Sequence, residues 1–276
     1  MKDKRIRMVA LDLDGTTLNN QKAISEKTVE AFGRAMEKGV HIVISTGRTF
    51  QSLPRQLFTI KGLEYVVTSN GAHITELANL KRIYENYIPA EAVEEIAERL
   101  EHKGFSVEAF VDGHAYIDKI EFDAIAAGVP TFRDADYILE TRNPVEGIFD
   151  FMRHHKGQIE NISVNFQFQK DREALRHELS QVKDITLTSS FPHNFEIGGK
   201  HTSKGQALLF LMERLGLSRD ELMACGDSPN DEEMIYLAGI GVAMENGEAS
   251  TKEIADYITD TNDRDGVAKA IEKFVL

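Results

Sequence analysis

Short apolar runs alternate with amphipathic stretches over the first 80 residues of the chain. Apolar runs of this kind predict buried strands of a parallel sheet, and the stretches between them predict helices. The expected strands are 8–13, 40–45 and 64–69. A helix is expected from Ser25, whose side chain can cap its first turn, to about Lys38, and Gly39 ends it. This part of the chain is therefore predicted to form βαβ units.

The pattern changes between about residues 85 and 190. Two short strands joined through Asp112-Gly113 predict a β-hairpin there. The expected elements of this middle third are a helix at 89–104, strands at 105–111 and 114–118, a helix at 145–155, a strand at 161–168 and a helix at 172–182. A stretch with its own hairpin and helices could form a separate small α+β domain.

The alternation of strands and helices returns after about residue 190. Strands are expected at 222–226, 240–243 and 256–259, and helices at 203–215 and 266–274. Outer thirds that match each other around a different middle indicate one sheet domain that carries an insertion. We therefore expect an α/β fold in which residues 1–84 and 191–276 form a parallel-sheet core and residues 85–190 form an inserted domain.

Composition argues against several other classes of protein. The 276 residues include 45 acidic and 32 basic side chains, which gives a formal charge of −13 without any basic run. Such a chain is not expected to bind a nucleic acid polymer or an anionic membrane. Cys225 is the single cysteine, so no intramolecular disulfide is possible. The longest apolar run, 207–212, is too short to cross a bilayer, and acidic residues interrupt any signal peptide. We expect a cytoplasmic protein, as a monomer or homodimer.

The first candidate site lies where an apolar strand leads into Asp12 and Asp14. Ligands of open parallel sheets bind beyond the carboxyl ends of the strands. Residues two apart on a strand point to the same side, with Cα atoms about 6–7 Å apart. Two carboxylates held that close repel each other and need a proton or a cation, and oxygen ligands suit Mg²⁺. The alternative is that both aspartates only end a strand and begin a turn.

A second acidic segment follows the apolar stretch 222–224. Asp227 and Asp231 could supply further oxygens to a cation, and the amide of Asn230 could bind a phosphate oxygen. The alternative is a helix N-cap, a position that Ser, Asn and Asp all favour. Because both acidic segments end strands of one expected sheet, we favour the metal site.

Two further segments could bind phosphate. Thr46 and Gly47 follow the strand 40–45, and a hydroxyl beside a glycine N–H is suited to an anion. A plain strand-to-helix turn is the alternative. Lys204 lies in the first turn of the expected helix 203–215, where its charge opposes the helix dipole. A phosphate would favour a lysine there, and a solvated surface lysine is the alternative.

In their order and spacing, these segments resemble the motifs of the haloacid dehalogenase-like phosphatases, most closely the Cof-type branch, subfamily IIB. The matching segments are 12–16, 46–48, Lys204 and 226–231, together with 69–72 and 262–267, which look typical of this branch. The resemblance implies a Rossmann-like core with an inserted α+β cap of the C2B type, which sets substrate specificity. Thr17 stands where leucine is usual, and Met244-Glu245-Asn246-Gly247 differs from the commoner Met-Gly-Asn-Ala.

The resemblance also implies roles for the acidic residues. Asp12 would attack phosphorus as the nucleophile and form an aspartyl-phosphate. Asp14 would protonate the leaving oxygen and later deprotonate the hydrolytic water. Asp12, the main-chain carbonyl of Asp14 and the side chain of Asp227 would bind Mg²⁺, with Asp231 supporting the metal from behind. The groups implied for binding the phosphoryl oxygens are the backbone at Leu13, Thr46, Gly47, Lys204 and Asn230.

We therefore expect Mg²⁺-dependent hydrolysis of a small phosphorylated metabolite, such as a sugar phosphate or a nucleotide- or flavin-related phosphate. A phosphomutase of the same superfamily is the alternative enzyme. A phosphorylatable receiver-like signalling module is the alternative from another class, but receiver domains are much shorter and their phosphoacceptor lies on a different strand from the acidic pair. Within the inserted part, Asp112, His114 and Arg133 are polar candidates for substrate binding, with solvated loop residues as the alternative.

Overall fold

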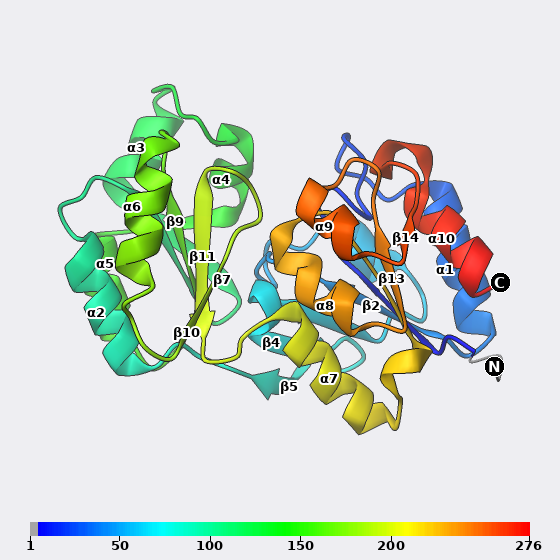
Figure 1. The fold of residues 1–276 in the computed structure, drawn as a ribbon. Helices are drawn as coiled ribbons and strands as arrows, with labels where there is room; N and C mark the ends of the chain where they lie inside the picture. The colour runs from blue at the N-terminus through cyan, green and yellow to red at the C-terminus, as the bar shows by residue number, and fades with distance from the viewer. Residues whose placement is uncertain (1–4) are drawn as a thin grey trace. The chain divides into compact units, whose positions relative to one another are not determined.

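A computed structural model describes residues 5–276 and divides the chain into two compact units (Figure 1). Unit 1 combines the chain up to Gly47 with Pro54–Glu85 and Ser203–Leu276. Unit 2 combines Arg48–Leu53 with Asn86–Thr202. The expectation that no signal peptide is present concerns the N-terminal residues, of which 1–4 lie outside the described part. Among the residues described, no helix has the length and apolar character needed to span a membrane.

Unit 1 contains one eight-stranded sheet in the order β14-β13-β12-β1-β2-β3-β4-β5. Its strands are β1 (Met8–Leu11), β2 (His41–Ser45), β3 (Tyr65–Thr68), β4 (His73–Glu76), β5 (Lys81–Glu85), β12 (Leu222–Gly226), β13 (Ile240–Ala243) and β14 (Tyr257–Ile258). The six strands from β14 to β3 pair in parallel, whereas β4 and β5 add an antiparallel edge. The predicted α/β fold with a parallel-sheet core is confirmed.

Helices cover both faces of this sheet. They are α1 (Glu26–Glu37), α7 (Lys204–Leu215), α8 (Glu232–Leu237), α9 (Ala249–Ile254) and α10 (Gly266–Phe274). Figure 1 shows α1 beside α10 on one face and α7 beside α8 on the other. The predicted cap of α1 is present, since the Ser25 side chain accepts a hydrogen bond from Thr28 N. The Ser203 side chain caps α7 by accepting from Gln206 N, which fixes the start of the helix that carries Lys204.

Unit 2 contains a six-stranded sheet in the order β10-β11-β9-β6-β7-β8. Its strands are β6 (Ser106–Val111), β7 (His114–Asp118), β8 (Arg142–Val145), β9 (Ile159–Asn165), β10 (Ile185–Thr188) and β11 (Asn194–Gly199), and its helices are α2 (Ala90–Leu100), α3 (Lys119–Ala126), α4 (Ala135–Thr141), α5 (Ile148–His154) and α6 (Lys170–Leu179). The predicted hairpin joins β6 to β7, and Asp112 and Gly113 both have positive φ, as a tight hairpin turn requires. Apolar residues of β6, β9 and β11 pack against α2, α5 and α6 in a core of their own.

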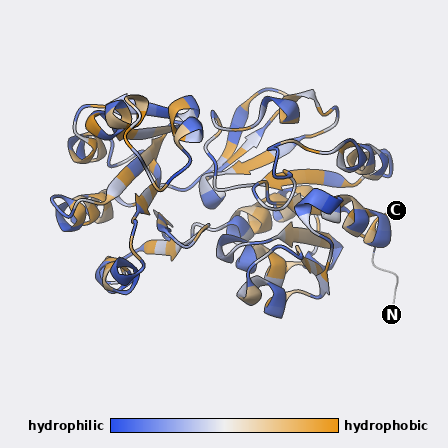
Figure 2. Ribbon diagram, turned by 90° about the horizontal axis from the view of Figure 1, so that it is seen from above, coloured by the Kyte–Doolittle hydropathy of each residue, from blue (hydrophilic) through white to orange (hydrophobic). Residues whose placement is uncertain are grey.

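The boundaries of unit 2 differ from those expected for the insertion, 85–190. The unit extends to Thr202 because β11 pairs antiparallel with both β9 and β10, and neither β10 nor β11 was expected from the sequence pattern. It also includes Arg48–Leu53, where Gln51 N donates a hydrogen bond to Gly113 O at 3.0 Å. Figure 2 shows strands of both units that are largely hydrophobic, while the surrounding helices carry residues of both kinds.

Candidate active site

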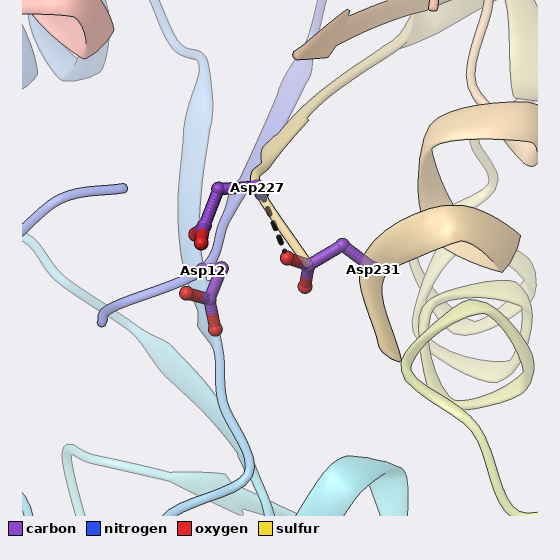
Figure 3. A group of neighbouring side chains, drawn as sticks. All are labelled: Asp12, Asp227 and Asp231. Carbon is purple, nitrogen blue, oxygen red and sulfur yellow. Dashed lines mark hydrogen bonds between the residues drawn. The ribbon is translucent and has the colours of Figure 1, made fainter. Parts of the chain in front are cut away.

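Three aspartates converge at one end of the unit 1 sheet (Figure 3). Asp12 follows β1, Asp227 follows β12, and Asp231 precedes α8. Because β1 and β12 pair in parallel, their carboxyl ends lie side by side. One carboxylate oxygen from each aspartate lies within 4.8 Å of the others, and the Asp12 and Asp231 side chains are buried. The sequence-predicted residues 12, 227 and 231 are thus brought together.

Asp14 lies in a turn and not on the strand 8–13 that the sequence predicts. β1 ends at Leu11, so the chain is already turning at Asp14, which is exposed and lies outside the three-aspartate cluster. Leu13 O accepts hydrogen bonds from the backbone N–H groups of residues 16, 17 and 18, which closes a tight turn. The expected strand 8–13 therefore ends early, at Leu11, and strand alternation does not place Asp14, although the charge of Asp14 still acts on Asp12 and helps to raise its pKa.

Lys204 is fully buried and joins two of the three aspartates. Its Nζ donates hydrogen bonds to Asp12 Oδ1 and Asp231 Oδ1, both at 2.6 Å. Burial acts to lower the pKa of Lys204, but the carboxylates of Asp12 and Asp231 outweigh burial and raise this pKa above its usual value. The solvated-surface alternative for Lys204 is therefore excluded, and two carboxylates account for a lysine in the first turn of α7.

The acidic groups crowd one another. Burial raises the pKa of Asp12 well above its usual range, against the opposing effect of Lys204, and the charges of Asp231 and Asp227 raise it further. Burial, with the charge of Asp231, raises the pKa of Asp227 to about 6. A bound cation would offset the repulsion between these carboxylates and favour their ionised form. The cluster supplies only oxygen atoms, so it fits a hard divalent metal ion.

Two glycines allow the acidic loops to approach each other. A Cβ atom on Gly15 would lie 2.5 Å from Asp227 Oδ2, and Gly15 has a φ of +78°, which L side chains rarely adopt. A Cβ atom on Gly226 would lie 2.4 Å from Asp231 Cβ. The close packing of these two segments therefore depends on the absence of side chains at both positions.

Hydroxyl and amide groups fix the orientation of Asp227 and Asp231. Thr16 Oγ1 donates to Asp227 Oδ1 at 2.7 Å, and Ser228 Oγ donates to Asp227 Oδ2 at 2.9 Å. Asp231 Oδ2 accepts from Asp227 N at 2.9 Å and from Ser228 N at 3.1 Å. Ser228 and Asp231 also form a capping box. The segment therefore caps a helix, as the alternative predicted, and also contributes to the acidic cluster.

The predicted phosphate-binding residues Thr46, Gly47 and Asn230 meet at Asn70. Asn70 N donates to Thr46 O at 3.1 Å, and Asn230 Nδ2 donates to Asn70 Oδ1 at 3.0 Å. A Cβ atom on Gly47 would lie 3.1 Å from Asn70 Oδ1. The stretch 69–72 resembles the family pattern, but the sequence by itself gives Asn70 no role. Its signal was an Asn-Gly pair after a strand, since Asn70 has the positive φ that asparagine tolerates.

Thr17 is a second residue whose contribution the sequence did not reveal. Its side chain is buried, and Thr17 Oγ1 donates to Asp12 O at 2.5 Å. This bond satisfies the first carbonyl beyond β1 and holds the chain where it leaves the strand. Leucine is the usual residue at this position in the family that the sequence resembles, and it has no hydroxyl group to make this bond.

The polar candidates in unit 2 are engaged within that unit. Arg133 donates to Glu108 and also to Ser106 Oγ at 2.9 Å, and Arg142 donates to Glu108 Oε2 at 2.9 Å. Burial acts to raise the pKa of Glu108, but the two arginines lower it to about 2. Asp112 and His114 belong to the β6–β7 hairpin, where Asp112 O lies 2.8 Å from the Nδ1 atom of His114. Arg133 is therefore part of a buried ion network.

The sequence is similar to those of known phosphatases and hydrolases. Residues 9–271 match the family described as haloacid dehalogenase-like hydrolase. The chain is 32% identical over 278 residues to the 5-amino-6-(5-phospho-D-ribitylamino)uracil phosphatase YcsE of Bacillus subtilis, covering 99% of this chain and 98% of that protein. It is 32% identical over 282 residues to the B. subtilis phosphatase YwpJ, covering 95% and 98%.

Solved structures show the same architecture. A haloacid dehalogenase-like hydrolase from B. subtilis superimposes with a TM-score of 0.84 at 28% identity, covering 98% of this chain and 100% of that one. A sugar phosphatase of HAD subclass IIB superimposes with a TM-score of 0.82 at 23% identity, covering 97% and 98%. The second likeness supports the fold alone.

Proposed function

We propose that this chain, which belongs to the haloacid dehalogenase-like hydrolases and is a phosphatase of that superfamily, is a Mg²⁺-dependent phosphomonoesterase that works through an aspartyl-phosphate on Asp12. The observation that carries the proposal is the buried contact of Asp12 with Lys204 beside two further aspartates. A nucleophilic carboxylate must be ionised. Burial and the neighbouring carboxylates raise the pKa of Asp12 and oppose ionisation, whereas the fully buried Lys204 ammonium group 2.6 Å away favours it, and a bound cation would favour it further.

The proposed reaction uses two carboxylates in turn. An Asp12 oxygen forms a bond to phosphorus while the bond between phosphorus and the substrate oxygen breaks. Asp14 gives its proton to the leaving oxygen. Asp14 then takes a proton from water, whose oxygen attacks phosphorus and releases phosphate from Asp12. Asp14 is exposed, which suits this role, because the leaving group and water both have to reach it.

Positive charge must be concentrated locally, since the chain as a whole carries a net charge of −13. We propose that the backbone at Leu13 binds the phosphoryl oxygens together with Thr46, Gly47, Lys204 and Asn230. Asp12, the Asp14 carbonyl and Asp227 would hold Mg²⁺, with Asp231 fixing Lys204 and the backbone of the 227–228 segment. The bound ion would neutralise phosphoryl charge in the transition state.

We propose that unit 2 sets the substrate, a sugar phosphate or a nucleotide- or flavin-related phosphate. Ile162 and Val164 face its apolar core, so the alternating residues Asn161, Ser163 and Asn165 face the other side of β9. Both amide atoms of Asn161 are buried without a partner among the described residues. Such groups suit the hydroxyl and amide groups of a polyol or a pyrimidine. A relative named for a ribitylaminouracil phosphate substrate supports this class.

The proposal is tested by measuring phosphate release over a broad panel of phosphorylated metabolites, ranked by kcat/KM. We expect turnover that a chelator abolishes and added Mg²⁺ restores, because the acidic cluster needs a cation to accept an anionic substrate. Full activity of the metal-stripped protein would contradict the metal assignment. With a hexose 1-phosphate, an isomerised sugar phosphate in place of free phosphate would instead support the phosphomutase alternative.

A further inference from the structure

Two asparagines hold the turn that follows Asp14. Asn246 Nδ2 donates to Gly15 O at 2.7 Å, and Asn246 Oδ1 accepts from Asn262 N at 2.9 Å. Asn262 Nδ2 in turn donates to Leu18 O at 2.9 Å. The pair therefore binds the carbonyl groups at both ends of the segment 15–18. Asn246 lies in the loop after β13 and Asn262 begins a short 3-10 helix after β14, both more than 200 residues along the chain from this turn.

The loop 244–248 also binds the segment that carries Asp227. Met244 N donates to Gly226 O at 3.0 Å, and Glu248 N donates to Asp227 O at 2.8 Å. A Cβ atom on Gly247 would lie 2.9 Å from Asp227 O, so the glycine permits this close approach. One loop thus connects the segment that carries Asp227 to the turn after Asp14.

Asp14 is the part of this turn that packing holds least, because it is exposed whereas Thr16, Thr17 and Leu18 after it are buried. Gly15, the next residue, has a φ of +78°, which leaves the peptide after it with considerable freedom unless its carbonyl is bound. Proton transfer requires hydrogen-bond reach, and small misplacements reduce it strongly. A bond to Gly15 O is well placed to limit the motion of the neighbouring carboxyl group.

We propose that Asn246 and Asn262 are positioning residues that hold the 15–18 turn so that Asp14 can protonate the leaving oxygen. The inference rests on the proposed function, which makes Asp14 the general acid. The proton passes from the Asp14 carboxyl group to the substrate oxygen as its bond to phosphorus breaks and the Asp12 oxygen bonds to phosphorus. A leaving group that needs no proton does not require this step.

The kinetic test compares two substrates in Asn246→Ala. p-Nitrophenyl phosphate releases a stable anion, whereas glycerol 2-phosphate releases an alkoxide that must be protonated. We expect kcat/KM to fall about tenfold more for glycerol 2-phosphate than for p-nitrophenyl phosphate, a part of the 10²- to 10⁴-fold typical of a general acid. Asn79→Ala is the matched control, since Asn79 is also exposed and also donates one hydrogen bond and accepts one. It should change neither value.

An equal fall for both substrates would show a general structural loss and overturn the inference, as would no fall for either. Hydrogen exchange gives a readout that does not need activity. Thr17 N and Leu18 N donate to Leu13 O, and we expect their exchange to be at least about threefold faster in Asn246→Ala, but unchanged in Asn79→Ala. Unchanged exchange in Asn246→Ala would overturn the holding role. Wild-type protein that hydrolyses neither substrate would instead contradict the proposed function.

Discussion

A buried lysine between two buried carboxylates is the feature on which the proposed chemistry depends most. Lys204 Nζ lies 2.6 Å from both Asp12 Oδ1 and Asp231 Oδ1. Even when such groups are paired, the free energy lost by removing their charges from water offsets much of the gain from pairing, so the cluster is a poor source of stability. The arrangement makes sense if Asp12 has to be ionised in a site that receives an anion.

Asp12→Asn is the most direct test at this scale. We expect turnover to fall at least about 10³-fold, because an amide is a far weaker nucleophile than a carboxylate. The measurement is phosphate release on the best substrate of the panel, with circular dichroism to check folding. Asp123→Asn, which changes an exposed aspartate on α3, is the control and should leave turnover unchanged. Near-normal activity of Asp12→Asn would refute the nucleophile assignment.

Gly15→Ala tests the dependence of the site on a bare backbone. The new methyl group would lie 2.5 Å from Asp227 Oδ2, and the positive φ alone costs about 1–2 kcal/mol. We expect a lower unfolding midpoint in denaturant and a loss of metal-dependent turnover. Gly33→Ala is a matched control, because Gly33 lies inside α1 with nothing within 4 Å of the added atom. That variant should be as stable as the wild type or more stable. Equal stability of both variants would contradict the steric argument.

At the scale of elements, β6 is joined to α4 and β8 by an ion network inside unit 2. Glu108 on β6 is fully buried between Arg133, which precedes α4, and Arg142, which begins β8. The Arg142 guanidinium lies 4.7 Å from the ring centroid of Tyr137 on α4, and the Arg48 guanidinium lies 5.0 Å from it. These contacts link the short α4 segment and the Arg48–Leu53 segment to the sheet of unit 2.

The network predicts a pH dependence of stability. The pKa of Glu108 falls from an ordinary 4.5 to about 2 on folding, so its contribution is present above pH 4.5 and is lost as the pH falls towards 2. The shift corresponds to about 3 kcal/mol. Glu108→Gln should therefore be less stable than the wild type at pH 7 in urea unfolding, and the difference should shrink by pH 3.5. Glu95→Gln, which breaks a partly exposed pair with Arg99 on one turn of α2, should change stability by less than about 1 kcal/mol. A difference for Glu108→Gln that is equal at both pH values would contradict the assignment.

At the scale of the whole molecule, unit 1 is built from three separate segments of the chain, because the Arg48–Leu53 and Asn86–Thr202 segments belong to unit 2. The interruption between β5 and α7 leaves the parallel sheet intact, because β12 pairs directly with β1. Residues 12 and 227 are consequently neighbours although most of the chain lies between them. A site of this kind forms only when the sheet is complete.

The expected elements were most accurate where a strong periodic pattern was bounded by capping residues. The helix after Ser25 begins where its predicted cap indicates, and the helix expected at 203–215 begins at Lys204, with Ser203 as its cap. Strands β10 and β11 were missed, because their residues are mixed polar and apolar and because β11 joins the sheet through β9, which lies more than 20 residues earlier in the chain. Pairing over that distance leaves little local signal.

Local chemistry was enough to identify Asp12, Asp227 and Lys204 as residues of interest, because acids after apolar strands and a lysine at a helix start are visible in any single segment. Packing decided the rest. In the folded chain, Asp14 lies in a turn beyond the strand, and Lys204 is buried between two carboxylates. The side chains of Asn70, Asn246 and Asn262 bind segments that are distant from them in the sequence. Hydrogen bonds between distant loops depend on how close two backbones can come. That distance depends on the order of the strands in the sheet and on glycines at the points of contact. A short stretch of sequence does not specify either the strand order or the partner segment.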